Sequence, residues 1–161
     1  MSRWTTIPPE LRDRIAGDIG GGGFPVGKCD HDHTHPPRAF EYPIPVKTVS
    51  ETNMREHWSE RHKRRKHQRT FARATTWEIL RQRGVTVSLP VTITLTRVGG
   101  RQMDSDNLGS SAKGVRDGIA DALGVDDGSS EITWVYAQRR GKPRGVHVEI
   151  MENRSEADLE V

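Results

Sequence analysis

Hydrophobic and polar positions alternate in some stretches of this chain and follow a helical spacing in others. Between residues 85 and 98, valine, isoleucine and leucine alternate with threonine and serine, which predicts a strand that ends at Gly99-Gly100. Pro90 interrupts this stretch, so a bulge or a break into two strands is expected there. The segment 41–46 (EYPIPV) contains two prolines, which confine it to an edge strand or an extended entry segment.

A long helix is predicted over about residues 53–82, and its two halves differ. The second half has Phe71, Trp77 and Leu80 to bury, whereas residues 59–70 contain no apolar side chain. A helix that is polar all round either bridges solvent or faces a charged neighbour. Because the charge here is positive, we expect a phosphate backbone or an acidic protein surface beside it.

A second helix is predicted over about residues 106–123. At about 100° per residue, its apolar side chains fall on one side, as a stripe that faces the core. These residues are Leu108, Ala112, Val115, Ile119, Ala122 and Leu123. Asp106, Ser110, Lys113 and Asp117 fall on the opposite side. The helix therefore presents two carboxylates and a lysine away from the sheet.

Two more strands are expected over about residues 131–139 and 146–151, joined as a hairpin by a basic turn. Together these elements predict an α+β fold, a small mixed β-sheet packed with two main helices, in a single domain over residues 41–152. Residues 1–40 are rich in Gly, His and Pro and are expected to form a flexible extension. Residues 153–161 are expected to form an acidic tail.

Several classes of protein are excluded by simple features of the sequence. No apolar stretch reaches the length of about 18 residues that a membrane span requires, so no membrane partner is expected. The first residues lack the apolar core of a secretory signal. Cys29 is the single cysteine of the 161 residues, which excludes an internal disulfide framework and indicates a reducing, cytoplasmic setting.

The basic residues are concentrated in two places, although the net charge is only +3. Eight lysines and arginines lie between residues 55 and 73, and a second group lies within residues 139–144. Such groups are typical of proteins that bind the phosphates of nucleic acids, whereas the alternative is a solvated helix face and an ordinary turn. The DNA-binding candidates are Arg55, Arg61, Lys63, Arg64, Arg65, Lys66, Arg69, Arg139, Arg140 and Lys142.

Carboxylates gather around the start and the end of the second predicted helix. Asp104 and Asp106 lie at its start, and Asp126 and Asp127 follow it, although only the turn after Leu123 decides whether they return to the same place. Clustered carboxylates favour Mg²⁺ or Mn²⁺ over zinc, and a nearby lysine stabilises charge that develops on a phosphate. The alternative is that these aspartates only cap the helix and shape the following turn.

The complete pattern resembles the RusA family of Holliday junction resolvases, small endodeoxyribonucleases common in phages and prophages. The resemblance rests on D-S-D-N-L at 104–108, Lys113, Asp117 and G-V-D-D-G at 124–128, and on the segment 50–58 that leads into the basic helix; it covers about residues 41–152. It implies a RusA-like fold and a homodimer that makes paired nicks in four-way DNA during recombination and repair.

The resemblance also implies roles for individual residues. Asp104, Asp106 and Asp127 would be the catalytic carboxylates that bind Mg²⁺ (or Mn²⁺ as a substitute), with Asp126 the weaker choice of its pair. Lys113 would be the catalytic lysine. In the best-known form of the family this lysine lies four residues after the second aspartate, where the present chain has Ser110.

Other interpretations stay open at this point. A non-catalytic nucleic-acid-binding protein and a less selective nuclease acting on flaps or other branched DNA would carry the same basic stretches. Cys29, His31, His33 and His35 alternate along the chain and would suit zinc, or they belong to a His-rich tract without a metal. Trp58 and Trp134 are expected to pack in the core or an interface, with base stacking as the alternative.

Overall fold

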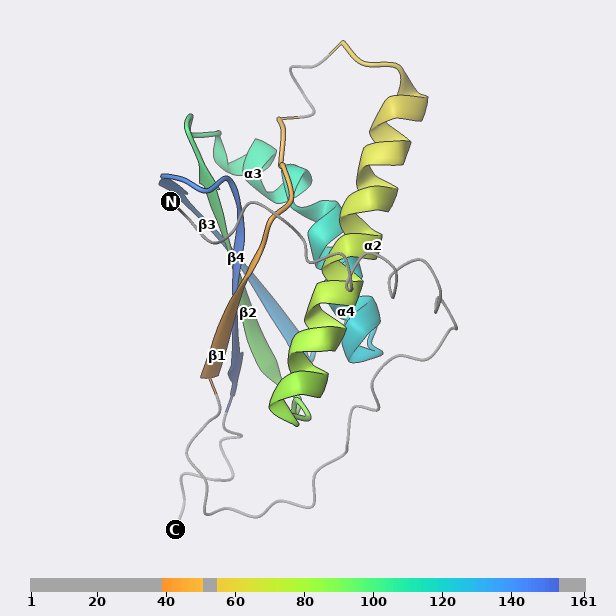
Figure 1. The fold of residues 1–161 in the computed structure, drawn as a ribbon, viewed down its shortest axis with the longest axis vertical. Coiled ribbons are helices and arrows are strands. Elements are labelled where there is room, and N and C mark those ends of the chain that lie inside the picture. Colours follow the sequence, from red (N-terminus) through yellow and green to blue (C-terminus); the bar gives the residue numbers. More distant parts are fainter. Residues whose placement is uncertain (1–38, 51–54, 154–161) are drawn as a thin grey trace.

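The computed structural model of this protein describes residues 39–50 and 55–153, and in this part of the chain four strands form one sheet with three helices (Figure 1). The predicted α+β class is confirmed at this level. The strands are β1 (Ala39–Ile44), β2 (Val91–Gly99), β3 (Ile132–Arg140) and β4 (Gly145–Glu152). The helices are α2 (Trp58–Arg83), α3 (Ser105–Ser111) and α4 (Lys113–Leu123). The expected boundary at residue 41 is wrong, because Ala39 and Phe40 of the predicted extension belong to β1, and Asn153 of the predicted tail donates from its N–H to the carbonyl of Pro90 at 2.8 Å. The rest of the extension and of the tail, with the Cys29–His35 tract, lies outside the described residues.

The sheet has the order β1-β4-β2-β3 and is mixed. β3 pairs parallel with β2, whereas β4 pairs antiparallel with both β2 and β1. Since β1 lies at one border of the sheet, the expectation of an edge strand near residues 41–46 is confirmed. Pro43 is tolerated there because an edge strand needs hydrogen bonds on one side only.

The predicted hairpin between the last two strands is wrong, because β2 lies between β3 and β4. Residues 141–144 cross over the end of β2, where the N–H of Gly141 donates to the carbonyl of Gly99 at 3.2 Å. The two outer strands of such a trio lie about 10 Å apart, and four residues span up to about 13 Å. A short turn is therefore compatible with either arrangement, and the sequence pattern does not distinguish them.

The two predicted helices are present with different boundaries. α2 begins at Trp58 and not near residue 53. The second helix is divided at Ala112, whose N–H is shared between the carbonyls of Leu108 and Gly109, so α3 and α4 replace a single helix. Its predicted apolar stripe is nevertheless buried as expected. Of the expected strand over 85–98, only the part after Pro90 forms β2.

α2 and α4 lie side by side on one face of the sheet (Figure 1). They approach closely because α4 has glycines at the contact: a Cβ built on Gly118 would lie 2.3 Å from the carbonyl oxygen of Arg69. Gln68 is buried and donates from its side chain to the carbonyl of Lys47 at 2.8 Å. Part of the polar stretch of α2 is thus a packing surface, which its lack of apolar residues did not indicate.

The core lies between this helical layer and the sheet. Alternate residues of β2 and β4 point into it, namely Val91, Ile93, Leu95, Val146, Val148 and Ile150. Tyr42 of β1 is also buried, and its hydroxyl group is 2.7 Å from that of Thr76 in α2. Burial raises the pKa of Tyr42 well above its usual range, so this side chain stays neutral. None of the described helices is long and apolar enough to cross a membrane.

Candidate functional site

Asp104 and Asp106 lie where the chain leaves β2 and enters α3. Asp104 is the N-cap residue of α3, but its side chain makes no capping hydrogen bond, and Asp106 lies in the first turn. The cap therefore lies two residues before Asp106, and Asp106 does not cap the helix. Both residues are exposed, and neither carboxylate has a hydrogen bond or ion pair within residues 39–50 and 55–153. These two carboxylates are available to a ligand.

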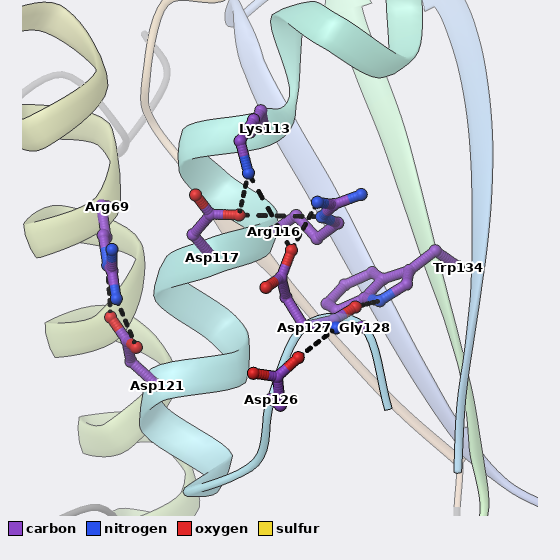
Figure 2. Close-up of polar contacts among 9 residues, drawn as sticks. All are labelled: Arg69, Lys113, Arg116, Asp117, Asp121, Asp126, Asp127, Gly128 and Trp134. Carbon is purple, nitrogen blue, oxygen red and sulfur yellow. Dashed lines mark hydrogen bonds and ion pairs between the residues drawn. The ribbon is translucent and has the colours of Figure 1, made fainter. Parts of the chain in front are cut away.

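Asp127 lies elsewhere, in a charged cluster along α4 (Figure 2). Lys113 Nζ is 3.2 Å from Asp117 Oδ1 and 3.9 Å from Asp127 Oδ2. Arg116 Nη2 donates to the same Asp127 oxygen, and Arg116 Nε lies 3.7 Å from Asp117 Oδ1. The turn after α4 therefore returns beside the helix and brings Lys113, Asp117 and Asp127 together, whereas the hypothesis required it to bring Asp127 to Asp104 and Asp106.

The turn is held in place by two further hydrogen bonds (Figure 2). The carbonyl of Asp127 accepts from Trp134 Nε1 at 3.0 Å, and Asp126 Oδ1 accepts from the N–H of Gly128 at 2.8 Å. Trp134 is half-buried against the core, as expected. Asp126 thus stabilises the turn, whereas the Asp127 carboxylate faces α4.

The three proposed metal ligands do not form a metal-binding group as they are arranged here. In the described part of the chain, no three His, Cys, Asp or Glu side chains are placed so that they could hold a metal ion. The Asp127 carboxylate is paired with Arg116 in place of joining Asp104 and Asp106. Burial alone would lower the pKa of Arg116, but Tyr136 and Asp127 more than offset it, so the pKa is raised. Arg116 is a firmly charged partner that competes with any cation for Asp127.

Several of the DNA-binding candidates on α2 are paired with carboxylates of the protein itself. Arg64 Nη1 donates to both carboxylate oxygens of Glu56, at 2.7 and 2.6 Å. Arg69 binds both oxygens of Asp121, at 2.6 and 2.8 Å, and Lys63 lies 2.8 Å from Glu60.

The remaining candidates are distributed over both basic groups. Arg61, Arg65 and Lys66 lie in the N-terminal half of α2, and Arg55 precedes the helix. Arg139 and Arg140 end β3, and Lys142 lies in the crossing segment; all three are exposed.

A cleft of about 550 Å³ opens at the end of β2 that leads to Asp104. Its walls come from residues 47–50, 97–104, 107 and 144–145. Four cationic side chains line it, those of Lys47, Arg97, Arg101 and Arg144, together with Asp104 and Asn107. These four cations were not among the predicted DNA-binding residues. One signal was visible: Arg97 follows Val91, Ile93 and Leu95 at the same spacing, where the alternation predicts an apolar side chain.

Comparison with known proteins adds no relative to this description: no protein-family model matches the chain, and no curated protein matches it.

Proposed function

We propose that this protein is a Mg²⁺-dependent endodeoxyribonuclease that resolves four-way DNA junctions, as its resemblance to the RusA family implies. The observation that carries the proposal is the pair Asp104 and Asp106: two exposed carboxylates without partners among the described residues, one of which lines a cleft that is otherwise cationic. Unpaired acids beside a surface suited to phosphates are hard to explain by DNA binding alone, because they repel the backbone. They are expected where a cation joins protein and phosphate.

The proposal assigns Asp104, Asp106 and Asp127 to the metal and Lys113 to the scissile phosphate. The position of Lys113 supports the proposal, because its Nζ lies 3.9 Å from Asp127 Oδ2 and its side chain is half-exposed. For the third carboxylate to join the others, Asp127 has to leave Arg116. Paired nicks in a symmetric junction also require two sites related by a two-fold axis, so the active form in this proposal is a homodimer.

The test is cleavage of a labelled synthetic four-way junction with and without Mg²⁺. We expect the wild type to cut only with the metal, and Asp106→Asn to bind the junction but not cut it. Asp126→Asn is the matched control, because asparagine still accepts the hydrogen bond from Gly128 and this residue is not assigned to the metal. Cutting by Asp106→Asn at the wild-type rate would reject the assignment.

A second candidate function is a nucleic-acid-binding protein without catalysis. It is favoured by one specific observation, that the acids of the described chain form no group able to hold a metal ion. In that case the wild type binds the junction in a salt-dependent manner and never nicks it, with Mg²⁺ or Mn²⁺. If cleavage occurs, flap and linear duplex substrates in parallel reactions separate a junction resolvase from a less selective branched-DNA nuclease.

A further inference from the structure

We propose that the cleft at the end of β2 binds a phosphate of the DNA backbone, and that Arg97 is its central anion-binding residue. The inference deepens the proposed function and rests on it for the choice of DNA as the ligand. The site consists of Lys47, Arg97, Arg101 and Arg144, with Asp104 on the same wall. It would hold the strand directly beside the carboxylates that the proposed reaction uses.

Arg97 is positioned by contacts that leave part of its guanidinium group free. Its Nε donates to Thr48 Oγ1 at 3.1 Å, and its Nη1 donates to the carbonyl of Arg101 at 2.7 Å. Nη2 has no hydrogen bond with the residues that the structure describes. Thr48 is buried, so the first contact ties the guanidinium group to a fixed point of the fold. An arginine held in this way loses little freedom when an anion binds.

The cations of this cleft have no acidic partners in the described chain. Within residues 39–50 and 55–153, no ion pair with a carboxylate involves Lys47, Arg97, Arg101 or Arg144, although Asp104 lies in the same wall. Burial first, and the positive charge of Arg144 second, lower the pKa of Arg97. Like charges kept close together repel one another, and an anion between them relieves the repulsion. A phosphodiester supplies that anion and fits a cleft of about 550 Å³.

Gly99 offers a way to disturb Arg97 without removing it. A Cβ built on Gly99 would lie 2.8 Å from Arg97 Nη2 and 2.9 Å from its Cζ, so the guanidinium group has to move. The adjacent Gly100 is the matched control, because its Cβ would meet only Arg144 Nη2, at 3.8 Å. Neither glycine has a positive φ, so alanine fits the backbone at both positions, and only the alanine at 99 displaces the arginine.

The experiment is the equilibrium binding of a fluorescently labelled four-way junction, measured by anisotropy in EDTA over a series of salt concentrations. Without a divalent metal no cleavage occurs, so binding is measured separately from the proposed reaction. We expect Arg97→Gln with Arg144→Gln to weaken binding on the order of tenfold or more and to reduce the salt slope by about two units. Gly99→Ala should show a smaller loss of the same kind, and Gly100→Ala a still smaller one, because its methyl group makes only an ordinary contact with Arg144.

Two controls keep the outcome clear. Arg81→Gln removes one positive charge at the C-terminal end of α2, which lies at the far end of the molecule from α3 (Figure 1), and should leave the slope unchanged. In a competition experiment, unlabelled DNA and inorganic phosphate are added separately to the labelled complex at the same concentration of phosphate groups. The comparison tests whether the cleft prefers a polynucleotide to a free anion. Displacement of the junction by free phosphate at that concentration would overturn the assignment to a DNA strand.

The result that overturns the inference is wild-type affinity and slope for the double variant at Arg97 and Arg144. If that variant does not fold, as judged by circular dichroism, Arg144→Gln alone and the two glycine variants decide the question. A wild type that binds through the cleft but never cuts the junction with Mg²⁺ would reject the proposed function and leave the cleft standing. If the wild type cuts the junction with Mg²⁺ but the salt slope of the double variant at Arg97 and Arg144 is unchanged, the cleft is rejected and the proposed function stands.

Discussion

Two basic regions of this molecule differ in what their charges contact. In the N-terminal half of α2, Arg64, Arg69 and Lys63 are paired with Glu56, Asp121 and Glu60. In the cleft at the end of β2, no carboxylate of the described chain pairs with the four cations. At least three of the eight lysines and arginines between residues 55 and 73 are thus neutralised by carboxylates of the chain, whereas none of the four cations of the cleft is neutralised by a described residue. The density of lysine and arginine along a chain is therefore a poor measure of its capacity to bind phosphate.

The largest effect is expected from Gly118→Ala, which tests whether the polar half of α2 is a packing surface. The new methyl group would lie 2.3 Å from the carbonyl oxygen of Arg69 and 2.8 Å from Ala72 Cβ, so the two helices have to separate. We expect a loss of about 1–3 kcal/mol in the free energy of unfolding, measured in urea. Gly109→Ala in α3 is the control, because its nearest neighbour would be Tyr136 at 3.9 Å. Equal midpoints for the two variants would contradict this packing.

The second prediction compares the two basic regions directly. Arg69→Gln combined with Asp121→Asn removes an ion pair of α2 and leaves the local charge unchanged. Its salt slope for junction binding should equal that of the wild type, whereas the double variant at Arg97 and Arg144 should lose about two units. Parallel titrations of both variants provide the measurement. If the salt slope falls more in the variant at Arg69 and Asp121 than in the cleft variant, α2 and not the cleft is the principal DNA-binding surface.

A smaller effect is expected from Asp121→Asn alone, which leaves the charge of Arg69 without the carboxylate that neutralises it. The freed charge should tighten junction binding by about twofold to fivefold at low salt, and the gain should vanish as salt screens it. Arg69→Gln completes the cycle of variants and isolates the coupling between the two residues. Binding that is unaffected at every salt concentration would place this part of α2 away from the DNA.

The smallest effect is expected from Glu60→Gln. Lys63 and Glu60 are both well exposed, with 71% and 55% of their side-chain surface accessible. Such pairs contribute little to stability, so the urea midpoint should match that of the wild type. The pKa of Glu60 is lowered first by its hydrogen bond from Lys63 and then by that charge. A clear fall in the midpoint would mean that ion pairs on α2 stabilise the fold more than their exposure indicates.

Much of the fold could be predicted because buried apolar residues recur along the sequence at the spacing of a helix or a strand. The stripe from Leu108 to Leu123 was identified correctly, even though the helix divides at Ala112. The edge position of β1 followed from its prolines. Trp134 packs against the core as expected, whereas Trp58 is 72% exposed and does not enter the core of the described chain.

The candidate site was predicted less completely, since its parts come from separate segments. The spacing placed Asp106 and Lys113 on one helix face, but it gave no information on Arg116 as the partner of Asp127. The cleft joins residues 47–50, 97–104, 107 and 144–145, which no local pattern connects. The metal-binding role of Asp104, Asp106 and Asp127 and the catalytic role of Lys113 stay predictions.

Most elements of this protein could be located from its amino-acid sequence, because side-chain burial and proline geometry act over a few residues and produce a regular spacing of apolar positions. The three-dimensional packing, by contrast, placed β2 between β3 and β4 and brought Arg144 of the crossing segment beside Arg97. It also decided which charges are neutralised, as when α4 brings Asp121 to Arg69. The reason is physical: electrostatic pairing depends on distances of a few ångströms in space, and residues far apart in the chain reach such distances only once the layers have packed.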